Sequence, residues 1–128
     1  MSYNKDLALN ILRQIESAIV RIQERTSQVH CADDFLLSSD RMEKLDAVCM
    51  MFIAIGESLK GLDKVTHKEL LTNYCPTIPW SKIMGLRDII AHHYFDVDVD
   101  EVWWILENEL SPLLNAIRSL INIVSSME

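Results

Sequence analysis

Residues 47–55, Ala-Val-Cys-Met-Met-Phe-Ile-Ala-Ile, are the stretch on which the prediction of the fold depends. They lie inside a longer helical pattern over residues 40–61. The nine residues are apolar on every face of that helix, so the helix needs cover on several sides. A second subunit or the remainder of a helical bundle would each supply this cover, and the sequence leaves both open.

Gly56 and Glu57 follow the apolar run directly. Because glycine has no side chain, Gly56 would let the backbone of another element come close to the helix. Glu57 places a carboxylate at the edge of the most apolar segment of the chain. Such a carboxylate is more often the partner of a basic side chain than a catalyst, so Glu57 is only a supporting candidate.

Apolar residues at three- and four-residue spacing continue on both sides of this segment. They predict further helices over residues 6–26, 80–93 and 100–126. Pro112 must kink or split the last of these, because proline lacks a backbone N–H group. Residues 66–69, Thr-His-Lys-Glu, have the form of a capping box and predict the start of a short helix. We therefore expect an all-α fold, an up-and-down bundle of four to five helices.

Length and composition restrict the class of protein. The 128 residues fit one domain, which we expect to span residues 1–128. No uninterrupted apolar run approaches the ~20 residues that cross a bilayer, and the polar start of the chain lacks the apolar core of a signal peptide. A cytoplasmic protein that does not bind a membrane is expected. The three cysteines are widely spaced and odd in number, which favours reduced thiols over a zinc site or a disulfide framework.

Charge is distributed unevenly along the chain, whose formal net charge is −7. This acidity argues against a general nucleic-acid coat protein, and DNA is not an expected partner. The segment 60–87 is nevertheless locally basic, and residues 88–128 are strongly acidic. The basic segment contains Lys60, Lys64, Lys68, Lys82 and Arg87. Solvated helix faces would give the same distribution, but the basic segment ends where a polar cluster begins.

That cluster is Arg87-Asp88-Ile89-Ile90-Ala91-His92-His93-Tyr94, at the end of the predicted helix 80–93. On a continuous helix each residue advances by ~100°, so Arg87 and Tyr94 share a face whereas Arg87 and His92 point ~140° apart. One regular helix therefore does not aim Arg87 and His92 at the same atom. Either the helix loosens near residues 91–93, or a second subunit completes the site across a two-fold axis.

The residue types of the cluster suit the cleavage of an RNA phosphodiester without a metal ion. Histidine titrates near neutral pH and can move a proton on or off a ribose hydroxyl or a leaving oxygen. Arginine stays charged and can stabilise the negative charge that builds on phosphate oxygens. RNA carries its own nucleophile, the 2′-hydroxyl. Lys60 and Lys82 of the basic segment are candidates for holding the RNA backbone nearby.

Purely structural roles are also open to the two histidines. A histidine near a helix end is most often a cap or a core residue. His92 and His93 are adjacent and point ~100° apart, so they do not form the i, i+4 pair typical of a helical zinc site. A metal-dependent enzyme built on them and nearby carboxylates is a weaker alternative. No glycine-rich phosphate-binding loop occurs in the sequence, so no nucleotide cofactor is expected.

Beyond these general arguments, the chain resembles a known family. Arg87-x4-His92-x-Tyr94 matches the RX4HXY motif of HepT-like toxins, which belong to the HEPN superfamily of helical nucleases. Three further segments are similar to that family: Ile55-Gly56-Glu57-Ser58-Leu59-Lys60, Tyr74-Cys75-Pro76-Thr77-Ile78-Pro79-Trp80, and Tyr94-Phe95-x-Val97-Asp98 with Val102-Trp103. The resemblance around these segments covers about residues 48–115. Their joint spacing is far more specific than an arginine and a histidine alone.

The resemblance implies a homodimer whose two motifs line a shared cleft. It implies a metal-independent endoribonuclease that needs no cofactor, with Arg87 and His92 as the catalytic pair. It also implies an antitoxin partner, a minimal nucleotidyltransferase of the MntA type, which transfers AMP from ATP to the motif tyrosine, here Tyr94. Attached phosphates would add negative charge and bulk where RNA must bind, and would so block the cleft.

One departure from the family pattern lies beside the catalytic pair. The family often has asparagine directly after the arginine, whereas this chain has Asp88. An acid beside Arg87 would weaken phosphate binding, and Asp88 is kept with His93 as a supporting candidate. The acidic composition also supports a second hypothesis, in which the chain is a non-catalytic helical subunit that binds and regulates a nucleotidyltransferase or presents its substrate.

Overall fold

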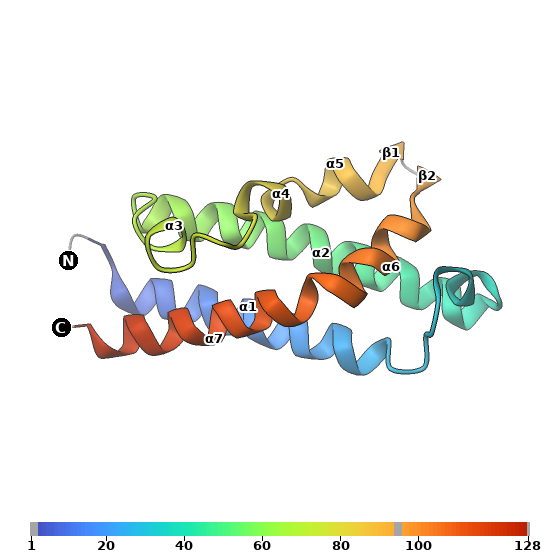
Figure 1. Cartoon of the computed structure of the whole chain (residues 1–128), viewed down its shortest axis with the longest axis horizontal. Coiled ribbons are helices and arrows are strands. Elements are labelled where there is room, and N and C mark those ends of the chain that lie inside the picture. Colours follow the sequence, from blue (N-terminus) through green and yellow to red (C-terminus); the bar gives the residue numbers. More distant parts are fainter. Residues whose placement is uncertain (1–2, 94–95, 128) are drawn as a thin grey trace.

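Three long helices form the body of the molecule (Figure 1). The computed structural model describes residues 3–93 and 96–127. The start of α1 and the end of α7 lie at the same end of the bundle (Figure 1), and α1 packs against both α2 and α7. The bounds are Lys5–Arg25 for α1, Ser39–Val65 for α2 and Leu110–Ser126 for α7, which is preceded by α6, Val99–Asn108.

Shorter elements complete the bundle and connect its helices. Two of these, α4 and α5, pack on α2, and η1 packs on α2 and α6. Their bounds are η1 Ala32–Leu36, α3 Leu71–Tyr74, α4 Trp80–Met84, α5 Leu86–Ile90, β1 Ala91–His93 and β2 Asp96–Val97. The predicted all-α class is confirmed, and the antiparallel pair β1–β2 is a small addition to it.

The core is built from the apolar faces that the helical spacing predicted. On α1, Leu12, Ile15, Ile19 and Ile22 are at most 1% exposed. Burying one such side chain contributes about 1.5–3 kcal/mol relative to leaving it in water. Equally buried residues from the other long helices complete this core: Phe52, Leu59 and Leu62 of α2, and Ile117, Leu120 and Val124 of α7.

The single chain covers α2 only in part. Val48, Phe52 and Ile55 are buried, whereas Met42 and Met50 are 49% and 69% exposed. The rest of the chain therefore covers one side of the apolar run 47–55 and leaves another side exposed to solvent. Despite this apolar surface, none of the helices that the structure describes has both the length and the apolar character needed to cross a membrane.

Residues 66–69 do not cap a helix, so the capping-box prediction is wrong, although the short helix expected after them is present as α3, Leu71–Tyr74. Thr66 instead ends α2, and its hydroxyl donates to the carbonyl of Leu62 at 2.9 Å. His67 and Lys68 take positive φ angles of 56° and 61°, and their N–H groups donate back to the last turn of α2. These bonds satisfy carbonyls that the helix end leaves free. Thr66 therefore caps the C-terminus of α2 rather than the N-terminus of a following helix.

Pro112 accompanies a split of the C-terminal helix, as predicted. α6 ends at Asn108 and α7 begins at Leu110, with Glu109 between them. In a continuous helix the proline ring would clash with the carbonyl of Asn108, four residues earlier. In α7 the proline lies in the first turn, where its missing N–H group would have no helical partner.

Gly56 is a point of very close approach between α2 and α4. A Cβ atom at Gly56 would lie 2.9 Å from the carbonyl oxygen of Ile83 and 3.2 Å from that of Met84. Both oxygens belong to the backbone, so neither can rotate away as a flexible side chain would. The prediction that Gly56 admits another backbone is confirmed, and the contact fixes α4 on α2.

Gly56→Ala is expected to destabilise the protein by about 1–3 kcal/mol, because α4 must move to admit the methyl group. The matched control is Gly61→Ala in the same helix, where a Cβ atom would meet nothing within 4 Å. Alanine is favoured over glycine in a helix by about 1 kcal/mol, so Gly61→Ala should leave the stability unchanged or raise it. Urea unfolding followed by circular dichroism measures both variants. Equal stability of the two variants would contradict the close approach.

Candidate active site

α5 presents Arg87 and Asp88 to solvent. Leu86 and Ile90 are four residues apart on one face of α5 and are only 3% and 0% exposed. Arg87 and Asp88 lie on the other side of α5 and are both exposed. Arg87 forms no ion pair with the side chains that the structure describes. Its guanidinium is therefore available to an anion from solvent.

The predicted continuous helix over residues 80–93 is wrong, because the chain forms α4, α5 and β1 there. The first break is at Gly85, whose N–H donates to the carbonyls of both Ser81 and Lys82. The second break follows Ile90, whose carbonyl accepts the N–H of Asp98 at 2.9 Å. The chain thus leaves the helix directly before β1. Apolar spacing continued across both breaks and for that reason did not reveal them.

Asp98, which directly follows β2, stabilises the second break. Besides its backbone bond to Ile90, its Oδ1 accepts the N–H of Glu101 at 3.1 Å and so caps α6. In the pair itself, Ala91 lies opposite Val97. One residue therefore starts α6 and ties its start to the end of α5.

The break resolves the geometric conflict that the sequence raised. Arg87 lies in a helix and His92 lies in a strand, so the ~140° separation of a continuous helix does not apply to them. The loosening of the helix near residues 91–93 is confirmed, whereas the convergence of Arg87 and His92 and the completion of the site by a second subunit stay predictions. The side chains of His92 and His93, and the whole of Tyr94, lie outside the described residues.

Two of the supporting candidates, Glu57 and Lys60, form an ion pair with each other. Lys60 Nζ lies 3.4 Å from Oε1 of Glu57, and both side chains are more than half exposed. Exposed pairs of this kind contribute little to stability, at most about 1 kcal/mol. Glu57 is therefore the partner of a basic side chain, as expected of a carboxylate in its position. Its negative charge offsets part of the positive charge of Lys60.

Lys82 also has a carboxylate partner. Its Nζ lies 3.0 Å from Oε1 of Glu109 and 4.6 Å from the centre of the Trp104 ring. Sequence reasoning missed Glu109 and Trp104, since the single sequence contains no signal that joins positions so far apart. The one hint is the position of Glu109 beside Leu110 within an apolar helical pattern.

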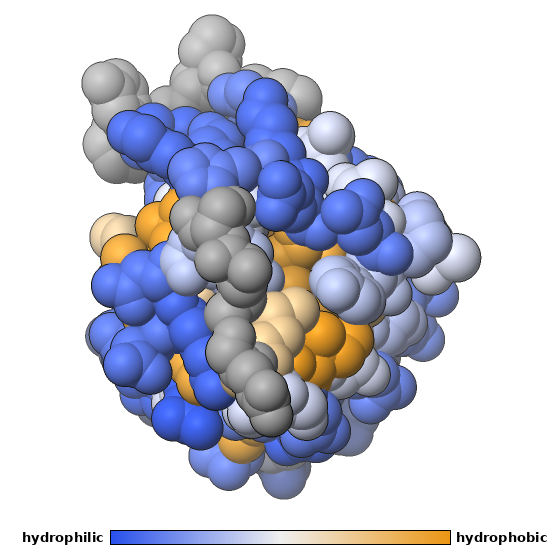
Figure 2. Space-filling view, turned by 90° about the vertical axis from the view of Figure 1, so that its left-hand side faces the viewer, coloured by the Kyte–Doolittle hydropathy of each residue, from blue (hydrophilic) through white to orange (hydrophobic). Residues whose placement is uncertain are grey.

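The basic segment does not gather around Arg87. Lys60 and Lys64 lie in the last turns of α2, and Lys68 follows them, near α3 and the chain ends, whereas α5 and β1 lie toward the other end (Figure 1). Figure 2 shows the end near α3, where a largely hydrophilic surface is interrupted by separate apolar patches. Of the predicted basic residues, Lys82 of α4 is nearest to Arg87 along the chain.

Burial lowers the reactivity of two of the three cysteines, Cys49 and Cys75. All three are free, as expected. Burial raises the pKa of Cys49 to about 11, with Asp46 nearby adding to the shift, and burial also raises the pKa of Cys75. Both therefore remain thiols at neutral pH. Among the side chains that the structure describes, which do not include those of His92 and His93, no group of three or more His, Cys, Asp or Glu could hold a metal ion.

Comparison with known proteins matches residues 15–120 to the family described as ribonuclease HepT-like. The chain is 32% identical over 109 residues to a protein named probable ribonuclease HepT from Thermococcus cleftensis, covering 85% of this chain and 91% of that relative. It is 30% identical over 95 residues to a Methanocaldococcus jannaschii protein provisionally named an RNase, covering 74% of this chain and 70% of the relative. No solved structure gives a significant match. With its motif, its helical fold and these relatives, the chain belongs to the HepT-like ribonuclease family of the HEPN superfamily.

Proposed function

We propose that this chain is the toxin of a toxin–antitoxin pair and acts as a metal-independent endoribonuclease, with Arg87 and His92 as its catalytic groups. The observation that carries this proposal is the backbone change between the two residues. Arg87 is exposed on α5, and His92 follows in β1 after the helix ends at Ile90. Membership of the HepT-like family and the names of the relatives support RNA as the substrate.

In the proposed reaction, the 2′-hydroxyl of the RNA attacks the adjacent phosphorus. His92 accepts the proton of that hydroxyl, the bond from phosphorus to the 5′ oxygen of the next nucleotide breaks, and that oxygen takes up a proton from water. Arg87 stabilises the negative charge on the non-bridging phosphate oxygens. The products are a 2′,3′-cyclic phosphate and a 5′-hydroxyl end.

The purified protein is expected to cleave RNA in the presence of EDTA and to leave 2′,3′-cyclic phosphate ends. His92→Ala and Arg87→Ala should each lower the rate by about 10²-fold or more, because each removes a group that acts in the transition state. Gel assays with mass spectrometry of the ends measure both effects. The control is Arg118→Ala, which removes an exposed arginine of α7 that is paired with Glu16 of α1.

Undiminished cleavage by both site variants would refute the assignment. A protein that cleaves no RNA, yet co-purifies stably with a nucleotidyltransferase, would instead support the non-catalytic subunit.

The active form is proposed to be a homodimer, with the two motifs lining one cleft. The support is the exposure of two apolar residues, Met42 and Met50, on a side of α2 that also carries the exposed Asp46. An isologous contact between two copies would cover such a surface. Since the helix ends at Ile90, nothing in the backbone requires Arg87 of one chain to act with His92 of the other, and we expect the catalytic pair to come from the same chain.

A mixed dimer tests this arrangement. Arg87→Ala and His92→Ala chains with different affinity tags are co-expressed and purified through both tags. We expect the mixed dimer to be as inactive as either variant, because each chain then lacks one member of its pair. Restored cleavage would show that the pair is formed across the two chains. Failure to recover a doubly tagged complex would contradict the dimer.

Control of the activity is proposed to lie at Tyr94. A minimal nucleotidyltransferase of the MntA type would transfer AMP from ATP to the tyrosine hydroxyl and release pyrophosphate. Incubation with such a partner and ATP should add AMP to the peptide that contains Tyr94 and abolish RNA cleavage. Tyr94→Phe should gain no mass and stay active. Tyr74, which is 51% exposed, is an internal control that should remain unmodified. Full cleavage by the modified protein would contradict this switch.

A further inference from the structure

Lys82 ties α4 to the break between α6 and α7. Its Nζ lies between Oε1 of Glu109, at 3.0 Å, and the Trp104 ring, at 4.6 Å from the ring centre. Trp104 belongs to α6, and Glu109 is the residue between α6 and α7. A cation held by a carboxylate and an aromatic ring together is restricted in its movement. This contact therefore fixes α4 relative to the C-terminal part of the chain.

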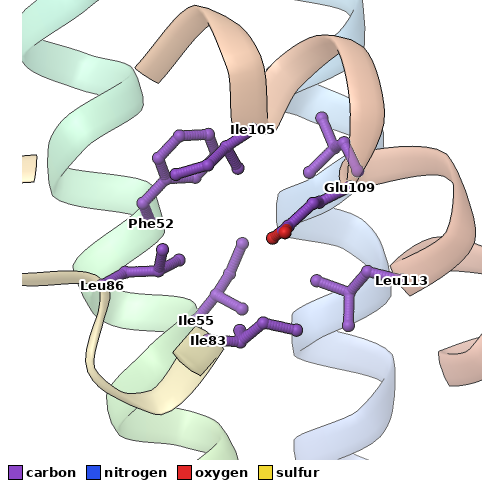
Figure 3. A pocket seen from close by; sticks show the side chains of 8 residues that line it. Phe52, Ile55, Ile83, Leu86, Ile105, Glu109 and Leu113 are labelled. Atoms are coloured by element: carbon purple, nitrogen blue, oxygen red, sulfur yellow. The ribbon is translucent and has the colours of Figure 1, made fainter. Parts of the chain in front are cut away.

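Glu109 depends on Lys82 to balance its charge. The Glu109 side chain is only 15% exposed, and its Oε2 is buried with no hydrogen-bond partner among the described residues. Figure 3 shows the carboxylate pointing into a cavity of about 10 Å³ that is otherwise lined by apolar side chains, among them Phe52, Leu86 and Leu113. Breaking such a pair leaves a partly buried carboxylate without its partner, which is costly. Loss of Lys82 would therefore disturb the cavity that Leu86 of α5 also lines.

A short, hydrogen-bonded connection joins Lys82 to Arg87. The N–H of Gly85 donates to the carbonyl of Ser81 at 3.1 Å and to that of Lys82 at 3.2 Å. The N–H of Asp88 then donates to the carbonyl of Gly85 at 3.0 Å. These bonds leave little slack between α4 and α5. A shift of α4 would consequently move Arg87 as well.

We propose that Lys82 and Glu109 are positioning residues that hold Arg87 in place for RNA cleavage, and that Lys82 is not a ligand of the RNA phosphates. This role rests on the proposed function. The two roles of Lys82 predict opposite results when Glu109 loses its charge. A phosphate-binding lysine would be set free and would bind RNA at least as well. A positioning pair would be broken, and cleavage would fall.

Steady-state cleavage of RNA by Lys82→Met and Glu109→Gln separates these roles. We expect both variants to lower kcat by about 10- to 100-fold with little change in KM, because a misplacement of ~1 Å can cost that much. Lys82→Arg should restore most of the activity, since a guanidinium can pair with Glu109 and stack on Trp104. The slope of log KM against log salt should not change in Lys82→Met, whereas loss of a phosphate contact would reduce it by about 1.

Hydrogen exchange provides a measurement that does not require catalysis. The backbone amides of residues 86–90 should exchange faster in Lys82→Met and in Glu109→Gln, while α1 and α7 keep their protection. The control pair is Arg118 and Glu16, which join α7 to α1 with the same N···O distance of 3.0 Å. Arg118→Met and Glu16→Gln should change neither kcat nor the exchange of residues 86–90.

The positioning role is overturned if Glu109→Gln keeps the kcat of the unaltered protein while Lys82→Met does not. It is also overturned if residues 86–90 exchange at the unaltered rate in both variants. An unaltered protein that cleaves no RNA would refute the proposed function alone, and the exchange rates would then decide on the positioning role. If Lys82→Met does not fold by circular dichroism, Glu109→Gln provides the same two measurements.

Discussion

The contact of Gly56 with the backbone of α4 is the constraint on which the position of Arg87 depends. Since a Cβ atom would lie 2.9 Å from the carbonyl of Ile83, only glycine allows α4 to sit this close to α2. α5 follows after one residue, Gly85, and packs on the same helix. Arg87 itself is exposed and has no ion-pair partner among the described residues. Its place is therefore set by the backbone beneath it and by the contacts of its neighbours.

Two helix breaks then place Lys82, Arg87 and His92 in three different elements, α4, α5 and β1. A continuous helix would have turned residues 87 and 92 away from each other. The chain instead closes α5 through the bond from the N–H of Asp98 to the carbonyl of Ile90, and the same aspartate caps α6. Of the acidic residues after the motif, Asp98 therefore has a structural use, because its side chain starts α6 and its backbone N–H bonds the end of α5.

The spacing of apolar residues was sufficient to predict the long helices but not the backbone of the candidate site. The spacing of apolar residues predicted α1, α2 and α7, and the chemistry of Gly56 and Pro112 predicted a close approach and a split. The helix breaks at Gly85 and after Ile90 were not predicted, because apolar residues remain at helical spacing across them. Thr66 was misassigned, since the same side chain can serve either end of a helix. The pair of Lys82 with Glu109 depends on tertiary structure, which a single sequence does not encode locally.

The pairing of basic residues changes how an acidic protein of this family would meet RNA. Counting charges along residues 60–87 suggests a basic surface, yet Lys60 is paired with Glu57 and Lys82 with Glu109. Among the described side chains of the motif, Arg87 is an exposed cation without an ion pair. In the proposed ribonuclease, a site whose described side chains offer so little free positive charge would bind bulk nucleic acid weakly. Each AMP group added to the motif would bring one negative phosphodiester charge, enough to offset one arginine, together with bulk that occupies the cleft.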